Sequence, residues 1–400
     1  MAPDLKLTPL PFHDALRGAL RDLEPGLWSW YASDGFGKKY ADDVRLELLR
    51  STYRMPREQH ALVYDIVDEI REAFGISAPA TLYQAQEDGP MNAGLVFVPG
   101  ELHVVFRGPI QAKLTEPELR ALLGHELAHH KLWMDRDGEY RITGTLIDET
   151  AARGGSPSHV HSALRFRLWT EIYADRAGLL ACDDLAAAVA CLVKVGTGLD
   201  RVDGAAYLEQ AAEAIGAKDT KSEGHTHPES FIRAFALKSW ASGGDFAEIE
   251  RLVEGPVEID GLDLVQQRAL TQTTRRLVDA ILAPPLLRTD ATLAHARRFF
   301  PDYAPTAAGE SLDLTGATES VAEYVAYVLL DFAMTDHEIE DVALAHVAAL
   351  SKTLGIKPSF RKIAKKELKL SVAALSDLEG RGFSLDTEPP PAVAQTEPAS

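Results

Sequence analysis

LLGHELAHHKL, residues 122–132, places His125, Glu126 and His129 in the pattern His-Glu-x-x-His. On an α-helix, residues four apart lie one turn apart on the same face, so both imidazoles can reach one metal ion while Glu126 points beside it. Zinc with three protein ligands keeps a fourth position for water, lowers the pKa of that water to about 7, and leaves a nearby carboxylate to take the proton. The motif therefore predicts a zinc site with two histidine ligands and Glu126 as the general base.

The residues before the motif predict a helix over residues 116–134. Thr115 and Glu118 have the spacing of a capping box, and Pro117 suits a first helical turn, where its missing N–H costs little. Leucines then recur at helical spacing. An alternative is a buried helix whose histidines are hydrogen-bonded core residues, but Glu126 would then be an unpaired charge near the core.

The third ligand has three candidates. Asp135 lies six residues after His129, as in metzincin-like sites, but those sites need a glycine for the turn, and Leu132 stands there instead. His159 and His161 could bind metal, but they lie in the loop-like stretch RGGSPSHVH, where nothing orients them. Neither alternative is supported by its surroundings.

Glu171, in TEIYADRAGLLA, is the strongest candidate for the third ligand. Glu171 and Asp175 are four residues apart on an apparent helix, so Glu171 can complete a tetrahedral site while Asp175 accepts a hydrogen bond from a ligand imidazole. Two carboxylates on one helical face are more often merely solvated. The nearby histidine motif shifts the balance towards a ligand.

Four segments resemble, in order, the gluzincin metallopeptidases of the CAAX prenyl protease and HtpX heat-shock protease type. They are MNAGLVFVPGELHVV, HELAHH, TEIYADRAG and HTHPESFIRAFAL, and the resemblance covers about residues 61–242. It implies a zincin-type peptidase domain with a small β-sheet and the motif helix. The zinc ligands of these peptidases match His125, His129 and Glu171, and their base matches Glu126.

Two further residues gain a role from the resemblance. In such peptidases the Asn of an N-A motif and the His of an H-P motif contact the substrate backbone or the developing oxyanion, and they match Asn92 and His227. Without the resemblance, Asn92 would be interpreted as a turn residue and His227 as a helix-capping or surface residue. If a strand edge is exposed beside the zinc, a peptide can add to it by main-chain pairing, with Asn92 at its entrance.

The composition limits the partners and the compartment. The 400-residue chain has a net charge of −19, which argues against nucleic acid or an anionic membrane as a partner, because phosphate binding needs clustered basic residues. Many of the similar peptidases carry transmembrane helices, but the longest apolar stretch here is broken by Asp183 and Asp184, so we expect no membrane span. Cys182 and Cys191 would face opposite sides of one helix, which indicates free thiols in a reducing cytoplasm.

The order of the elements predicts a mostly helical α+β protein. Strands are expected in TLYQAQ, GLVFV and ELHVVF, with a tight turn at Pro99-Gly100, whereas the polar segment 135–161 is expected to be a loop. The expected divisions are an N-terminal helical region packing on the core (1–75), the zinc peptidase core (76–244), a helical connector (245–319), an all-helical domain (320–385) and a disordered tail (386–400).

The all-helical C-terminal domain has a faint resemblance of its own. Its two apolar helices should meet at a capping box of Thr335 and Glu338, with Gly355 ending the second helix. Over this short segment the sequence resembles the TerB-like tellurite-resistance domain. Such a domain could bind a protein partner.

The sequence therefore predicts a zinc-dependent endopeptidase whose metal-activated water attacks the peptide bond of a protein or peptide, with Glu126 as base. The alternative is a catalytically silent, zinc-stabilised interaction protein that uses the peptidase fold and the C-terminal domain to bind partners. Every residue type that catalysis needs is present, which favours the enzyme.

Overall fold

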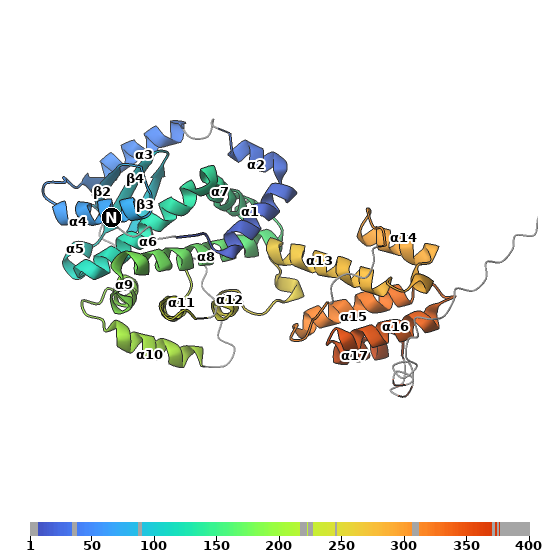
Figure 1. The fold of residues 1–400 in the computed structure, drawn as a ribbon. Helices are drawn as coiled ribbons and strands as arrows, with labels where there is room; N and C mark the ends of the chain where they lie inside the picture. Colours follow the sequence, from blue (N-terminus) through green and yellow to red (C-terminus); the bar gives the residue numbers. More distant parts are fainter. Residues whose placement is uncertain are drawn as a thin grey trace, which may run out of the picture. The chain divides into compact units, whose positions relative to one another are not determined.

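The protein forms two compact units in the computed structural model (Figure 1), in which helices predominate over one small sheet. The structure describes residues 7–33, 38–86, 90–216, 222, 227–244, 246–305, 312–369, 373 and 376. The first unit comprises Met1–Gly255 with Asp263–Val265, and the second comprises Pro256–Leu262 with Gln266–Ser400. The expected tail 386–400 lies outside the described residues.

The sheet belongs to the first unit and has the strand order β1-β2-β4-β3. The sequence predicted β2 (Ala80–Ala85), β3 (Asn92–Val98) and β4 (Glu101–Arg107), but it did not predict the short strand β1 (Thr52–Arg54). β2 pairs with β4 in parallel, whereas the β1–β2 and β3–β4 pairs are antiparallel. Gly100, with φ 77°, allows the tight β3–β4 turn. β3 is left as an edge strand.

The two faces of β3 pack against different helices. Ala93 and Leu95 join the main core, which α6 (Glu116–Met134) shares, whereas Val96 packs with Leu48 of α3 (Lys38–Ser51). Alternate residues of a strand point to opposite faces. Phe97 therefore lies on the same face of β3 as Ala93 and Leu95.

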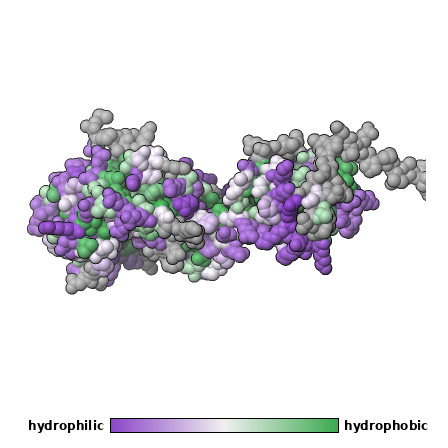
Figure 2. Space-filling model, turned by 90° about the horizontal axis from the view of Figure 1, so that it is seen from below, coloured by the Kyte–Doolittle hydropathy of each residue, from purple (hydrophilic) through white to green (hydrophobic). Residues whose placement is uncertain are grey.

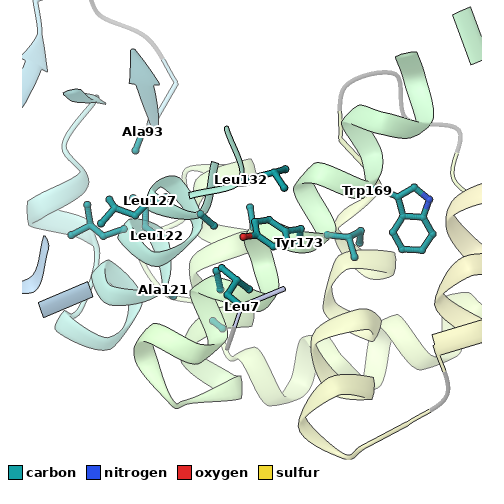
Figure 3. Packing of buried hydrophobic residues seen from close by; sticks show 14 of the residues in the cluster. Leu7, Ala93, Ala121, Leu122, Leu127, Leu132, Trp169 and Tyr173 are labelled. Atoms are coloured by element: carbon teal, nitrogen blue, oxygen red, sulfur yellow. The ribbon is translucent and has the colours of Figure 1, made fainter. Parts of the chain in front are cut away.

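Helix α6 has the predicted bounds and the predicted start. The Thr115 side chain accepts from the backbone at Glu118, whose Oε2 accepts from the Thr115 N–H at 2.8 Å, so the capping box forms. Figure 3 shows Leu122, Leu127 and Leu132 of this helix in the core with Tyr173 of α8 (Pro157–Cys182).

Helices α6 and α8 lie side by side, and small residues set how closely they approach (Figure 1). A Cβ placed on Gly178 would lie 2.6 Å from the Ala121 carbonyl oxygen, and one on Gly124 would lie 2.5 Å from the Ala181 Cβ. Both positions need glycine because a side chain would force the helices apart. This close approach brings the motif of α6 against Glu171 and Asp175 of α8.

The predicted loop over residues 135–161 is wrong. After a short turn in which Arg136 and Asp137 have positive φ, the chain forms α7 (Glu139–Ala152), and only residues 153–156 separate α7 from α8. The polar composition concealed a helical repeat, since Tyr140, Ile142, Thr143, Leu146 and Ile147 are buried along one side of α7.

The continuous helix expected after Glu171 is also wrong. Asp183 adopts a left-handed conformation with φ 52° and ends α8, and Asp184 caps α9 (Leu185–Thr197) by accepting from the Ala187 N–H. Cys182 and Cys191 therefore lie on different helices, and both are free thiols. Gly198, with φ 74°, terminates α9.

The remaining helices of the first unit pack around this centre, and side chains of α1 join its core. His13 of α1 is fully buried against the rings of Tyr140, Phe166 and Tyr173, and burial lowers its pKa to about 3. The bounds are α1 (Pro11–Leu23), α2 (Pro25–Tyr31), α4 (Ala61–Ala73), α5 (Ile110–Lys113), α10 (Gly204–Ile215), α11 (Ser230–Ala241) and α12 (Phe246–Glu254).

The second unit has a core of its own. Its helices are α13 (Leu264–Ile281), of which the first two residues belong to the first unit, α14 (Asp290–Phe299), α15 (Glu319–Ala333), α16 (Glu340–Thr353) and α17 (Lys357–Glu367). Side chains of α13 and α14 share this core with α15, α16 and α17, and α12 packs in the core of the first unit. The boundary suggested by the sequence near residue 244 thus lies one helix earlier than the boundary between the compact units.

The capping box predicted for the C-terminal helices is wrong, whereas the predicted stop is present. α16 begins after Ile339, and the Thr335 hydroxyl donates to the Asp331 carbonyl oxygen instead of capping a helix. Gly355, with φ 79°, follows the end of α16. Glu338 lies in the turn between α15 and α16 and therefore precedes the first residue of α16.

Hydrophilic and hydrophobic residues are mixed over the face of each unit seen in Figure 2. Among the described residues, no helix combines the length and the apolar character that crossing a bilayer requires.

Candidate metal centre

Three potential metal ligands converge where α6 faces α8. The Nε2 atoms of His125 and His129 lie 3.3 Å apart, and the Glu171 carboxylate lies 3.5 Å from the first and 3.6 Å from the second. One ligand atom from each residue can be chosen so that all three lie within 4.8 Å of one another. The helical spacing of four residues and the close packing of two helices produce this cluster.

The chemistry of the cluster fits a bound cation. Glu171 Oε2 is buried and makes no hydrogen bond, although a buried polar atom normally has a partner. Burial alone would raise the pKa of Glu171, but His125, His129 and Arg233 hold it below its ordinary value, so the group is a carboxylate. Two imidazole nitrogens and one carboxylate oxygen form a donor set that suits zinc and leaves a coordination position open.

Asp175 orients one of the ligands. Its Oδ1 lies 3.0 Å from His125 Nδ1, so the Nδ1–H donates to the carboxylate and the ring is held with Nε2 towards the cluster. Although burial would raise the pKa of Asp175, Arg233 and His125 lower it below its ordinary value. The structure therefore places Asp175 where the sequence predicted a supporting hydrogen bond.

Arg233, on α11, had no role assigned from the sequence. Its Nε and one terminal nitrogen both donate to Asp175 at 2.6 Å, and a terminal nitrogen lies 3.6 Å from Glu171 Oε2. The guanidinium is nearly buried, so this fork holds Asp175 in place. Only its position in the HTHPESFIRAF segment could have indicated this contact, because the two residues are 58 apart in the chain.

Arg233→Met should weaken zinc binding about 10- to 100-fold, as expected when the residue that orients a ligand's hydrogen-bond partner is lost. Asp175 would remain buried without its bidentate partner and would hold His125 less firmly. Competition with a chromophoric chelator measures the affinity, and Arg176→Met is the matched control, since Arg176 stacks over Trp240 instead. Equal affinity in the wild type and Arg233→Met would exclude this role.

Glu126 lies beside the ligands and is nearly buried. Burial raises the pKa of its carboxyl group to about 7, against the lowering effect of the charges on His125 and Arg233. A carboxyl group with this pKa can both accept and return a proton near neutral pH. Its chemistry therefore suits the predicted acid–base role.

The cluster opens into a cavity of about 580 Å³ that both remaining predicted site residues line. Asn92 is exposed at the start of the edge strand β3, where its Oδ1 accepts from the Ala93 N–H at 2.9 Å. His227 Nε2 lies 3.5 Å from Glu171 Oε2, with the side chain 56% exposed. The structure thus brings Asn92 and His227 into the same cleft as the ligands.

The other candidate ligands lie away from the cleft. Asp135 accepts from the Arg136 N–H at the end of α6, and His159 Nδ1 lies 2.7 Å from the Ser156 hydroxyl at the start of α8. His161 is ten residues before Glu171 on α8, which corresponds to roughly 15 Å along a helix. Neither Asp135 nor either of these histidines lines the cleft.

A comparison with protein families matches the part of the chain that contains the histidine motif. Residues 57–147 match the model of Peptidase family M48, and this range contains His125, Glu126 and His129. The similarities support an M48 zincin-type peptidase.

One curated relative extends the similarity beyond that range. The plastoglobule-localized metallopeptidase 48, chloroplastic, of Arabidopsis thaliana is 25% identical over 229 residues, which cover 51% of this chain and 64% of that protein. The chain therefore matches less than two thirds of the relative's length. No solved structure matches the chain.

Proposed function

We propose that the first unit is a zinc-dependent endopeptidase of the gluzincin type, similar to the CAAX prenyl and HtpX-type proteases, with His125, His129 and Glu171 as zinc ligands. The observation that carries this proposal is the convergence of two imidazole nitrogens and a buried carboxylate oxygen in an open cleft. A closed structural zinc site usually has four protein ligands, whereas a hydrolytic site has three.

The chain's own residues supply acid–base chemistry beside the metal. When bound, zinc provides Lewis acidity towards water and the substrate carbonyl. Glu126 accepts the proton of the attacking water on its carboxylate and then donates it to the leaving amine, a role worth about 10² to 10⁴ in rate. The His227 imidazole, at the rim of the cleft, can donate a hydrogen bond to the oxygen that becomes negative.

The edge strand β3 suits an extended substrate. β3 pairs only with β4 among the described strands, so its outer edge is not paired with another of these strands. Asn92, Ala93 and Leu95 of this strand line the cleft. A peptide that adds to this edge would pass the zinc ligands, and Asn92 would hold one of its carbonyl groups.

Chelator-sensitive cleavage of casein by the zinc-loaded full chain tests the function. We expect cleavage that stops with chelator and returns with added zinc. Zinc binding without cleavage of casein or of a peptide library would instead favour the silent interaction protein. We further propose a cytoplasmic location, consistent with the two free thiols, and a partner-binding role for the C-terminal helices.

A further inference from the structure

Arg141, in the first turn of α7, lies over the far end of β3. Its guanidinium carbon is 5.1 Å from the centre of the Phe97 ring. The side chain is partly buried, and burial lowers its pKa. Among the residues that the structure describes, no carboxylate forms an ion pair with this guanidinium.

The neighbouring charges are directed elsewhere. Glu139, two residues earlier, pairs with Arg17 and Arg21 of α1, and residues two apart on a helix point in nearly opposite directions. Arg136 contacts Asp14 and the Tyr140 hydroxyl. Arg141 thus differs from Arg17, Arg21 and Arg136, each of which has an acidic partner.

A continuous row of side chains joins Arg141 to the candidate metal centre. Trp133 lines the cleft, with its ring centre 6.0 Å from that of His129 and 5.8 Å from that of Phe97. Phe97 is on the same face of β3 as Ala93 and Leu95, which also line the cleft. These separations place Arg141 within about five residues of an extended peptide from His129.

We propose that Arg141 binds a carboxylate of the substrate that lies along β3, up to about five residues from the scissile bond. This inference rests on the proposed peptidase function. A guanidinium that has lost part of its hydration without gaining an anion is suited to bind one, and its planar fork matches a carboxylate. Because the protein's charge of −19 repels strongly acidic chains, the expected substrate has a single carboxylate at this position.

The carboxylate has two possible sources, an acidic side chain and the C-terminus of the peptide. Binding to zinc-loaded Glu126→Gln can be measured by fluorescence anisotropy with labelled decapeptides of alanine and leucine. In one series a single glutamate moves through every position of a C-terminally amidated peptide, and glutamine replaces it in the reference series. In a second series, peptides that end at successive positions carry either a free or an amidated C-terminus.

We expect that a glutamate at one position of the first series, or a free C-terminus at one length in the second, lowers the Kd about tenfold or more relative to its uncharged counterpart. This is the usual effect of a hydrogen bond to a charged group. When combined with Glu126→Gln, Arg141→Met should remove this preference and Arg141→Lys should keep part of it. Arg141→Glu should instead give a preference for lysine at the same position. Arg153→Met is the matched control, since Arg153 is exposed at the other end of α7 and pairs with Glu149.

Equal binding of the glutamate and glutamine peptides and of the two C-terminal forms would overturn the inference, as would a carboxylate preference that persists in Arg141→Met. Either result leaves chelator-sensitive casein cleavage, and so the proposed function, unaffected. An Arg141-dependent preference in a protein that cleaves neither casein nor any peptide would support the carboxylate site and contradict the peptidase.

Discussion

Glu126→Gln should keep its zinc and lose peptidase activity by at least about 10². Glutamine preserves the shape of the nearly buried side chain but cannot accept the proton of the attacking water or return it to the leaving amine. Metal analysis and the rate of casein cleavage measure the two effects in the same sample. Glu149→Gln, on the exposed side of α7, is the control and should behave as the wild type.

The result that would contradict this role is equal proteolysis by the wild type and Glu126→Gln, each fully loaded with zinc. Such a result would mean that another group carries the proton. Loss of both zinc and activity would assign Glu126 to metal binding, which the geometry does not favour, since the clustered ligand atoms come from His125, His129 and Glu171.

Glu171→Ala should lower zinc affinity by at least 100-fold, more than the loss of a group that only orients a ligand. It removes one of three donors and leaves the half-buried His125 and His129 facing an apolar methyl group. His159→Ala and His161→Ala should leave zinc binding nearly unchanged, because both lie far along α8 from the cluster. Chelator competition on the three variants measures the affinities.

Zinc loss in the histidine variants, without zinc loss in Glu171→Ala, would contradict the assignment of Glu171 as the third ligand. If His159→Ala or His161→Ala lost zinc while Glu171→Ala remained loaded, the third ligand would come from the start of α8. The resemblance to gluzincin peptidases would then lose the residue that most specifically supports it.

Local patterns predicted the elements that carry the candidate metal centre well. The capping box and leucine spacing gave both ends of α6, and alternation with a Pro-Gly turn predicted β3 and β4. The four-residue spacing of Glu171 and Asp175 predicted their shared face before any contact between helices was known. These features depend on residues close in sequence, so they can be recognised without a structure.

Contacts between distant segments were harder to predict. Arg233 and Asp175 are 58 residues apart, so spacing in the sequence did not predict their pairing, and the residues alone gave Asn92 and His227 only structural roles. The helix α7 was missed because its segment is polar in composition, and packing of its buried side against α1 and α8 stabilises it. The units divide near Gly255 because α12 buries its apolar side in the first core.

Titrating metal-free protein with zinc while casein cleavage is followed tests the central claim most directly. We predict that activity rises in proportion to added zinc, reaches a plateau at about one equivalent for one site per chain, and stays near zero in Glu126→Gln at every zinc level. Cleavage by the metal-free protein, or cleavage that zinc restores equally in the wild type and Glu126→Gln, would contradict it.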